Sequence, residues 1–357
     1  MREHLGLGHG TRSTVVAIGL LASLGLSVLM LTYLSLEWGR AYAGFADQGY
    51  QSVLHIGQWI DYYLGTIVFG FPSTWRALAA GVMIGLVAPV IGAFLIHRQM
   101  ALIGETLAHT AFAGVAAGVV LVAFTGWQGS LVIVDVGSQG GLLLVALVVS
   151  AFGALGLQWL TRRSQSYGDV PIAIVLAGSF AIGTLLISWS RDFAPISVDV
   201  EGFLFGSLAI VTTEGARLIA LMSLVVLAVT ARHYKQFVFI TFDEEAARVA
   251  RLPVNRYNTL LVVMTAVVVV GAMQILGVIL VAAMLVVPAA AASHLAVSFR
   301  ESVILGIVFG QISALGGLLF SLLAGLPPGG SIVVVAISVY LLTIFIGDRS
   351  QSGLPAY

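Results

Sequence analysis

The sequence predicts an all-α membrane protein, a polytopic bundle of about nine or ten transmembrane helices, each requiring roughly 20 apolar residues. Of the 357 residues, 59% are hydrophobic and only 9% are charged, whereas roughly 25% of a soluble globular protein is charged. Long apolar runs recur along the whole chain, and residues 257–299 contain no Asp, Glu, Lys or Arg. These observations indicate a chain that crosses a membrane many times.

Each predicted span is an apolar run bounded by Gly, Pro or charged residues. The predicted spans are 14–36, 75–96, 103–124, 141–160, 170–189, 215–231, 257–275, 277–293, 302–324 and 331–347. Small residues recur at a spacing of four within three of these spans, at Gly81/Gly85, Gly114/Gly118 and Gly306/Gly310. In lipid, such spacing lets two helix backbones approach closely, so these positions predict packing faces within a compact bundle.

The charges predict the orientation of the chain. If the N-terminus is cytoplasmic, Arg98, Arg162, Arg163 and Lys235 fall in cytoplasmic loops together with most other basic residues, and the outer loops collect acids. Cytoplasmic loops of membrane proteins carry an excess of Lys and Arg. We therefore expect a multi-pass protein of the cell (plasma) membrane, in contact with lipid, with both termini in the cytoplasm.

Residues 1–75 are expected to form an N-terminal extension with one transmembrane anchor and an outer, aromatic-rich segment. Ala41-Tyr42-Ala43 resembles a signal-peptide cleavage site, but the preceding apolar run is longer than that of a usual leader, which favours an uncleaved anchor. Aromatic side chains at the headgroup level are the expected role of Trp38, Tyr50, Trp59, Tyr62, Tyr63 and Trp75. A binding surface is the alternative. Residues 76–347 are then the transmembrane domain, and residues 348–357 a short cytoplasmic tail.

Several function classes are excluded by what the sequence lacks. Without cysteine, the chain has no thiolate metal site and no cysteine nucleophile. Its formal net charge of zero gives no field to attract nucleic acid. The single lysine, Lys235, follows Tyr234 rather than a glycine, so the phosphate-binding loop of ATPases is missing. Neither H-E-x-x-H nor G-x-S-x-G occurs. We expect no enzyme activity, no catalytic residues and no cofactor.

Glu105 and His109 are the leading site candidates, because they place two titratable groups in the apolar segment GETLAHTAFAGVAAG. Residues four apart share one face of a helix, and an ionisable group inside a membrane costs at least about 2.5 kcal/mol. Imidazole with carboxylate suits a transient zinc or manganese site, although two ligands do not complete one. The alternative is a structural Glu–His hydrogen bond or a pair wetted at the interface. Weaker candidates, for which a structural or solvated role is the alternative, are Gln274, His294, Ser207, Glu214, His4 and His9.

The segment from Ala231 to Tyr257 interrupts the apolar pattern on the predicted cytoplasmic side. Asp243 is suited to cap a short helix, Glu244 and Glu245 favour its first turn, and Pro253 ends it. Such a helix between two spans is a candidate docking element, and an ordinary solvated loop is the alternative.

Three blocks of sequence resemble the permease subunits of ABC-type zinc, manganese and iron uptake systems. The first is HRQMALIGETLAHTAFAGVAAGVVL, residues 97–121. The second is FDEEAARVARLPV followed by GAMQILGVILVAAMLVVPAAAA, within residues 242–292. The third is LPPGGSIVVV, residues 326–335, supported by VDVEGFLFGSLAIVT at residues 198–212. Together they extend from about Ala77 to Ile346, and the extension before them lies outside the resemblance.

The resemblance implies an ABC importer permease fold, a homodimer, a pair of cytoplasmic ATPase subunits and an extracytoplasmic metal-binding protein. It places Glu105 and His109 on the metal path and the ATPase-docking contact on Asp243, Glu244, Glu245, Ala246, Ala247, Arg248, Val249, Ala250, Arg251 and Leu252. Two positions depart from the family's pattern: Glu105 stands where Asp is usual, and Arg251 stands where glycine is common. The segment Thr106–His109 looks closer to the zinc members than to the manganese members.

The function expected from these features is inward movement of a divalent metal by alternating access, with zinc preferred and manganese accepted. One alternative is a secondary, ion-coupled metal transporter that uses Glu105 and His109 as a proton relay. The other is a membrane scaffold or sensor that transports nothing.

Overall fold

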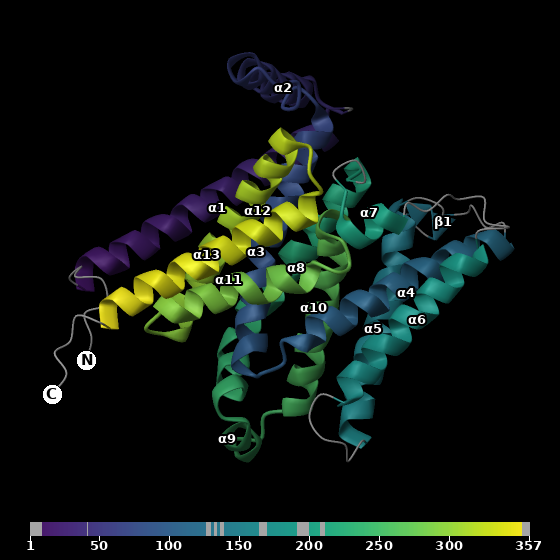
Figure 1. The fold of residues 1–357 in the computed structure, drawn as a ribbon, viewed down its shortest axis with the longest axis vertical. Coiled ribbons are helices and arrows are strands. Elements are labelled where there is room, and N and C mark those ends of the chain that lie inside the picture. Colours follow the sequence, from purple (N-terminus) through teal and green to yellow (C-terminus); the bar gives the residue numbers. More distant parts are fainter. Residues whose placement is uncertain are drawn as a thin grey trace. The chain divides into compact units, whose positions relative to one another are not determined.

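A computed structural model describes residues 9–40, 42–125, 130–131, 134–135, 139–163, 170–190, 200–207 and 211–351. Within these ranges the regular secondary structure is helical except for one antiparallel pair of two-residue strands, β1 (Ser130–Leu131) and β2 (Val134–Asp135). The helices in chain order are α1 (His9–Gly39), α2 (Gly44–Leu64), α3 (Pro72–His97), α4 (Leu102–Thr125), α5 (Gln139–Arg163), α6 (Val170–Ser190), α7 (Val200–Phe205), α8 (Thr213–Phe242), α9 (Glu244–Val249), α10 (Val254–Leu276), α11 (Val281–Leu295), α12 (Phe299–Ala324) and α13 (Pro328–Gln351) (Figure 1). The predicted all-α class is confirmed.

The helices belong to two compact units. The first contains α1 to α3 and, from Ala283 onward, α11 to α13, and the second runs from His97 to Ala282. These boundaries differ from the predicted division at residues 75 and 347, which rested on sequence resemblance and stays a prediction. The first unit therefore joins the N-terminal extension to the last three helices of the chain.

Nine helices within the described residues are long and apolar enough to cross a membrane, as predicted. The predicted span at 277–293 corresponds to α11, which has only 15 residues and is too short for a full crossing. Gly277, with φ of 76°, ends α10, because the left-handed conformation that glycine adopts freely does not continue a helix. Among the described residues, nine of the nine or ten expected spans therefore have full length.

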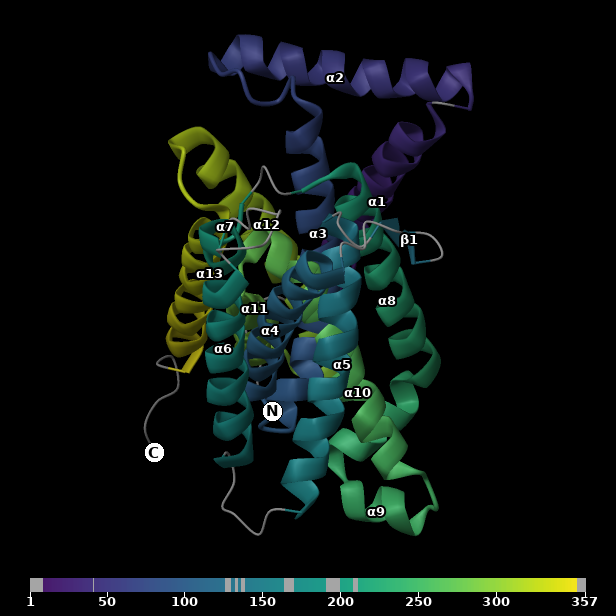
Figure 2. The same ribbon diagram turned by 90° about the vertical axis from the view of Figure 1, so that its right-hand side faces the viewer.

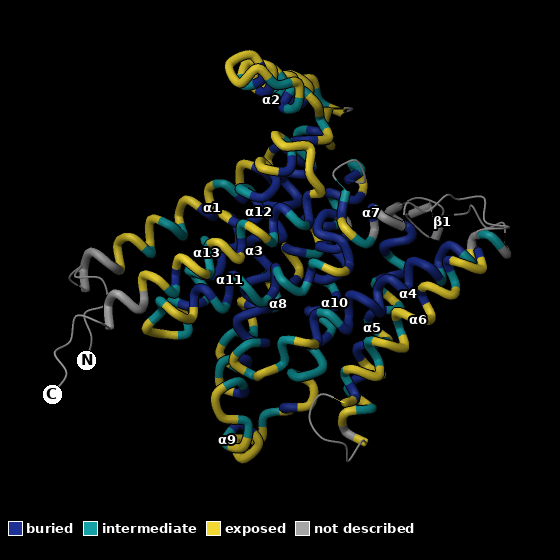
Figure 3. The backbone as a smooth tube through the Cα atoms, in the orientation of Figure 1, coloured by how far each residue is buried: buried dark blue, intermediate teal, exposed yellow. Residues whose placement is uncertain are grey.

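The glycine pairs predicted to mediate packing do so in the first unit. A Cβ atom on Gly85 of α3 would lie 2.9 Å from the carbonyl oxygen of Gly310 on α12, and one on Gly310 would lie 2.4 Å from the carbonyl oxygen of Gly85. The two backbones therefore touch at this crossing. Helix α3 is buried along nearly its whole length (Figure 3), so it forms the centre of this unit.

Helix α1 is bonded to the rest of the first unit through polar groups inside apolar surroundings. The buried Gln311 of α12 donates its amide to Ser27 Oγ at 2.8 Å, and Arg76 of α3 pairs with the buried Glu37 at 2.7 Å. Such bonds fix the register between helices in lipid. The uncleaved anchor stays a prediction that an intact N-terminal mass would check.

Helix α2 (Gly44–Leu64) was not predicted as a helix; its residues were expected only to belong to an outer, aromatic-rich segment. In Figure 2 it lies crosswise to α3 at the end where α1 and α3 meet it. Trp59, Tyr62 and Tyr63 are exposed, as a position at the headgroup level requires. Tyr50 was wrongly assigned to that group, because it is only 2% exposed and its ring stacks on Tyr33 at 5.9 Å between centroids.

Asp61 organises the connection from α2 to α3. Its carboxylate accepts hydrogen bonds from the backbone N–H groups of Val68, Phe69 and Gly70 and from the hydroxyl of Thr66, at 2.7–2.9 Å. Partial burial alone would raise the pKa of Asp61, but these four hydrogen bonds to the charged form prevail and lower it to about 2 from an ordinary 3.8.

The pH dependence of this connection follows from the sign of the shift. Because the folded-state pKa is depressed, the stabilisation is present above pH 3.8 and is lost as the pH falls through about 2. We expect Asp61→Ala to reduce hydrogen-exchange protection of the Val68, Phe69 and Gly70 amides by about 10-fold at pH 6, since bonds to a charged acceptor are worth roughly 1.5–3 kcal/mol. Asp47→Ala, at an exposed acid of the same helix, is the control. Equal protection in both variants would contradict the assignment.

Candidate functional site

The leading candidates lie on α4, which packs between α5 and α6 in the second unit (Figures 1 and 2). The packing is close because glycines lie where α4 meets its neighbours: a Cβ on Gly114 of α4 would lie 2.8 Å from Ala146 Cα of α5, and one on Gly183 of α6 would lie 2.7 Å from the ring of Phe112 of α4. Gly114 belongs to a pair predicted to mediate packing. The face of α4 that carries the candidates is therefore held inside helices rather than presented to solvent.

Glu105 and His109 are brought together by one turn of α4, as their spacing predicted. Glu105 is half-buried in the first turn, and His109 is 8% exposed. The imidazole ring meets the ring of Phe180 on α6 edge to face, with centroids 5.0 Å apart. Its Nδ1 atom is buried and has no hydrogen-bond partner among the described residues.

A buried nitrogen without a partner requires an explanation, since most buried polar side-chain atoms are hydrogen-bonded and an unpaired one costs about 1–3 kcal/mol. A metal ion accepts the lone pair of a neutral imidazole, so the donor set fits a transient ion. Within the described residues, however, no three His, Cys, Asp or Glu side chains gather into one group. The pair alone would be a partial ligand set, and its role in metal binding stays a prediction.

Hydroxyl groups beside the pair were missed from the sequence. Thr110 bonds the carbonyl oxygen of Thr106 at 2.8 Å and lies 3.3 Å from Ser179 Oγ on α6. Both hydroxyls bond a carbonyl one turn earlier in their own helices, which is the ordinary way a helix in lipid satisfies them. In the sequence, only the position of Thr110 next to His109 in an apolar run could have indicated it. A hydroxyl in that position is equally compatible with helix packing and with ligand binding.

The predicted docking segment forms a short helix that begins at the predicted cap, but it ends at Val249 rather than at Pro253, which instead precedes α10. Asp243 caps α9 by accepting a hydrogen bond from Ala246 N at 2.8 Å. Ala247 is fully buried and packs with Ile240 and Val254. Around this core, Glu244 pairs with Arg248 on the surface, and Glu245, Val249, Ala250 and Leu252 complete the segment.

Arg251, one of the two departures noted above, has a φ of 60°. That left-handed conformation is one that glycine adopts without strain and other residues rarely adopt. A glycine, which the resemblance implies is common here, would adopt this conformation without strain, whereas the arginine adopts it at some cost.

The chain before α9 differs from the prediction. Residues 232–242 were expected to be loop, but α8 continues through them to Phe242, with one non-helical residue at His233. Phe237 and Ile240 are buried, and the rings of His233, Phe237 and Tyr257 contact one another. Tertiary packing outweighs the local polarity of the segment, so α9 lies at the end of a long helix rather than within a loop.

The weaker candidates whose side chains are described, Glu214, His294 and Ser207, belong to no group of three metal-ligating side chains. Glu214 and His294 are exposed, and the ring of His294 lies 3.3 Å from the hydroxyl of Tyr340. Ser207 is half-buried beside Gly206. The side chains of His9 and Gln274, and the whole of His4, lie outside the described residues.

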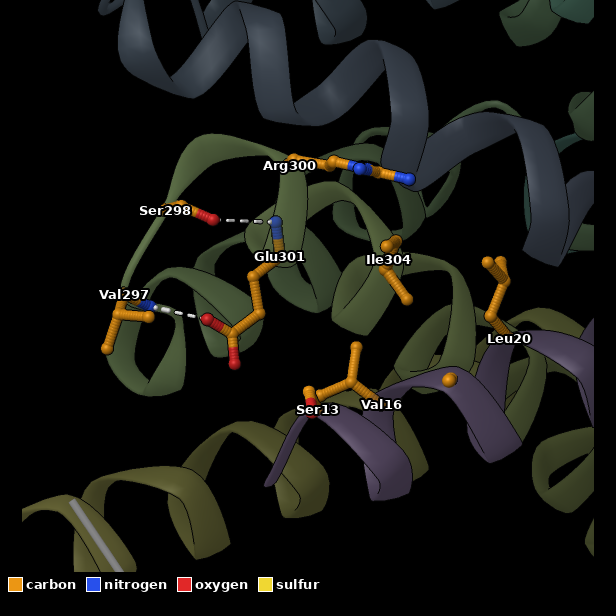
Figure 4. Close-up of a pocket in the computed structure, with 9 residues that line it drawn as sticks. Ser13, Val16, Leu20, Val297, Ser298, Arg300, Glu301 and Ile304 are labelled. Carbon is orange, nitrogen blue, oxygen red and sulfur yellow. Dashed lines mark hydrogen bonds between the residues drawn. The ribbon is translucent and has the colours of Figure 1, made fainter. Parts of the chain in front are cut away.

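Two cavities border described helices. One, of ≈ 400 Å³, lies between α1 and the start of α12 in the first unit. Figure 4 shows that the main polar groups there cap α12: Val297 N donates to Glu301 Oε2 at 2.9 Å, and Glu301 N donates to Ser298 Oγ at 3.3 Å. The other, of ≈ 370 Å³, lies in the second unit and is lined by Gln99, Met100, Gln158, Arg248, Asn255 and Asn258 among others.

Comparisons with known proteins agree on one family. The profile of the ABC 3 transport family matches residues 71–347. The manganese transport system membrane protein MntC of Listeria monocytogenes serovar 1/2a is 30% identical over 274 residues, covering 77% of this chain and 90% of its own. The manganese import system permease protein ScaB of Streptococcus gordonii is 28% identical, covering 77% and 92%. The solved structure of PsaBC from Streptococcus pneumoniae in complex with Fab is similar with a TM-score of 0.67 at 29% identity, covering 79% of this chain and 94% of that one.

Proposed function

The chain belongs to the ABC 3 transport family and is a membrane permease subunit of a metal importer rather than an enzyme, and on this premise we propose that it carries zinc or manganese inward by alternating access. Separate ATPase subunits supply the energy, because the sequence holds no phosphate-binding loop of its own. The metal is the transported substrate, and no cofactor takes part.

The observation that carries the proposal is the buried imidazole of His109, whose Nδ1 has no partner among the described residues, one helical turn from Glu105. A passing ion would meet one nitrogen and one carboxylate. Two ligands from one chain hold an ion weakly enough to release it, whereas a closed tetrahedral site would trap it. A second copy of the chain would bring another pair to the path, which supports a homodimer.

The identity of the transported metal, zinc or manganese, is a separate question. The relatives above carry manganese in their names, and imidazole with carboxylate accepts either ion. The zinc preference rests on the resemblance of residues 106–109 and stays a prediction. Uptake of each ion in competition with the other, in vesicles, is the measurement that distinguishes them.

Each predicted side of the membrane has its own partner protein in this function. The Asp243–Leu252 segment takes the cytoplasmic ATPase pair, and an extracytoplasmic metal-binding protein delivers the ion. Both termini lie in the cytoplasm in this arrangement, which follows from the distribution of Arg and Lys.

Reconstitution in proteoliposomes tests the function against its alternatives. We expect metal uptake only with the ATPase partner and ATP. Uptake driven by a pH gradient without the ATPase would instead support a secondary transporter with a Glu105–His109 proton relay. Metal-independent behaviour under both conditions would support a scaffold or sensor.

Substitution of Val249 tests the docking contact. Val249 is 85% exposed on α9, so an apolar side chain is offered to a partner while folding does not depend on it. We expect Val249→Asp to reduce recovery of the ATPase with the permease by about 10-fold, the effect of roughly 1.4 kcal/mol lost at an interface. The measurement is pull-down of the ATPase with purified permease.

The control for docking is Arg163→Ala, at an exposed arginine that rests on Trp159 at the end of α5. We expect this variant to recover the ATPase like the parent. Full recovery of the ATPase by Val249→Asp would show that docking does not use α9.

A further inference from the structure

One arginine bonds both helices that support α9. Arg98 lies in the turn immediately before α4, and its guanidinium donates from Nε to Thr241 Oγ1 at 2.9 Å and from Nη1 to Asn258 Oδ1 at 2.6 Å. Thr241 is the penultimate residue of α8, and Asn258 lies in the second turn of α10. The bonds therefore reach the helix before α9 and the helix after it. We call Arg98, Thr241 and Asn258 the Arg98 clasp.

Helix α9 and its two supports form one packed piece. Ala247, at the centre of α9, is buried against Ile240 of α8 and Val254 of α10. The N–H of Leu252 donates to the carbonyl oxygen of Ala247 at 3.1 Å and closes the turn into α10. A push on α9 therefore moves Thr241 and Asn258 as well.

The other end of the clasp is joined firmly to α4. Gln99, with a φ of 56°, makes a tight left-handed turn, and α4 begins three residues later. His97 adds a second contact to the end of α8, because its ring meets that of Phe242 edge to face with centroids 5.8 Å apart. Since a helix is stiff, a displacement of Arg98 reaches Glu105 and His109 within the next two to three turns.

Helices α4 and α10 also pack directly against each other, but the turn before α4 faces the docking helix α9 across open space. The cavity of ≈ 370 Å³ is lined by Gln99 and Met100 of the turn and by Arg248 of α9, so open space separates much of the turn from the docking helix. The hydrogen bonds of Arg98 lie along one border of that space, since Asn258 lines the cavity too.

The guanidinium of Arg98 could also form a further hydrogen bond. Its Nη2 is buried and has no partner among the described residues. Burial lowers the pKa of Arg98, and the charge of Glu244 on α9 acts in the opposite direction. Arg98 is therefore partly desolvated, and the acidic side chain that acts on its charge, Glu244, lies on the docking helix α9.

We propose that Arg98 is a positioning residue that transmits movement of the docking helix α9 to α4, and so to Glu105 and His109. The role of Arg98 in transport rests on the proposed function, whereas the hydrogen bonds that Arg98 makes do not depend on that function. Arg98 touches neither metal nor nucleotide; it sets the position of the helix that carries the metal pair according to the position of α8 and α10.

A distance measurement tests the clasp without any ATPase or metal. The chain has no cysteine, so cysteines introduced at the exposed Leu102 and Val249 can be spin-labelled specifically in the full chain in lipid nanodiscs. We expect one narrow distance distribution in the parent, and a shifted and broader one after Arg98→Ala. Arg256→Ala, which removes an exposed arginine from α10, should leave the distribution unchanged. An unchanged distribution after Arg98→Ala would overturn the proposal.

A second experiment separates transmission from simple stabilisation. In proteoliposomes with the ATPase, we expect Arg98→Ala to keep ATP hydrolysis while metal moved per ATP falls by about 10-fold, with partial rescue by Arg98→Lys. Asn258→Leu should lower the same ratio, and adding Arg98→Ala to it should cost little more, because the two residues act through one bond. Hydrolysis and transport falling in proportion would mark a merely structural role and overturn the proposal. If the parent shows no ATP-driven uptake, the proposed function fails, and the distance measurement alone decides the clasp.

Discussion

Replacing His109 with alanine is expected to reduce metal uptake by at least about 10- to 100-fold, the loss that follows even from removing an outer-shell partner of a metal site. His109 supplies the only nitrogen of the pair, and its buried Nδ1 has no partner among the described residues. Alanine is small and apolar, so it suits the surroundings of α4, and the permease should still assemble. The measurement is uptake of radioactive zinc or manganese into proteoliposomes that contain the complete complex.

Carboxylate variants extend this test to Glu105. Glu105→Gln keeps the shape of the side chain and removes the charge, so we expect a loss similar to that of His109→Ala. Glu105→Asp restores the residue usual in the family, and we expect it to retain most of the uptake. His55→Ala removes an exposed histidine of α2 and should have no effect.

A double variant decides the assignment. If Glu105→Ala with His109→Ala assembles, binds the ATPase and still takes up metal at the parental rate, then neither residue lies on the metal path. Loss of uptake together with loss of assembly would not count as support, so the size of the complex must be measured on the same preparation by gel filtration.

Local signals in the sequence were sufficient for the candidate pair and the docking helix. Glu105 and His109 needed only the periodicity of a helix, and the start of α9 needed only an acidic cap at Asp243. Both depend on residues close together in the sequence. Their prediction therefore did not require knowledge of the tertiary fold.

Features that depend on distant partners were not predictable in the same way. Helix α2 contains Gly44, Gly49 and Gly57, yet it forms a helix in which Tyr50 stacks on Tyr33 and Asp61 binds the following turn. The Arg98 clasp joins residues 143 and 160 positions apart. No pattern within a single segment indicates which polar side chain will meet Arg98.

The spacing of small residues was only partly informative. It predicts that a helix has a packing face, but not which glycine of that face is essential. Gly306 and Gly310 of α12 were equivalent in the sequence. In the structure, a Cβ on Gly310 would lie 2.4 Å from both the carbonyl oxygen of Gly85 and Pro89 Cγ, whereas the closest atom to a Cβ on Gly306 would be Pro89 Cβ at 3.4 Å. The first separation is a clash with backbone, and the second is ordinary van der Waals contact.

We therefore expect Gly310→Ala to be severely destabilising and Gly306→Ala to be tolerated, although the two positions are one turn apart on the same helix. Overpacking a tight core costs about 1–3 kcal/mol, and here the obstructing carbonyl belongs to the backbone of α3, which is buried along nearly its whole length and cannot rotate away as a side chain does. The measurement is the midpoint of thermal unfolding and the yield of monodisperse protein in detergent. Equal midpoints for the two variants would show that α3 and α12 do not cross by backbone contact at Gly85 and Gly310, because a crossing held by side chains alone would accommodate one methyl group at either position.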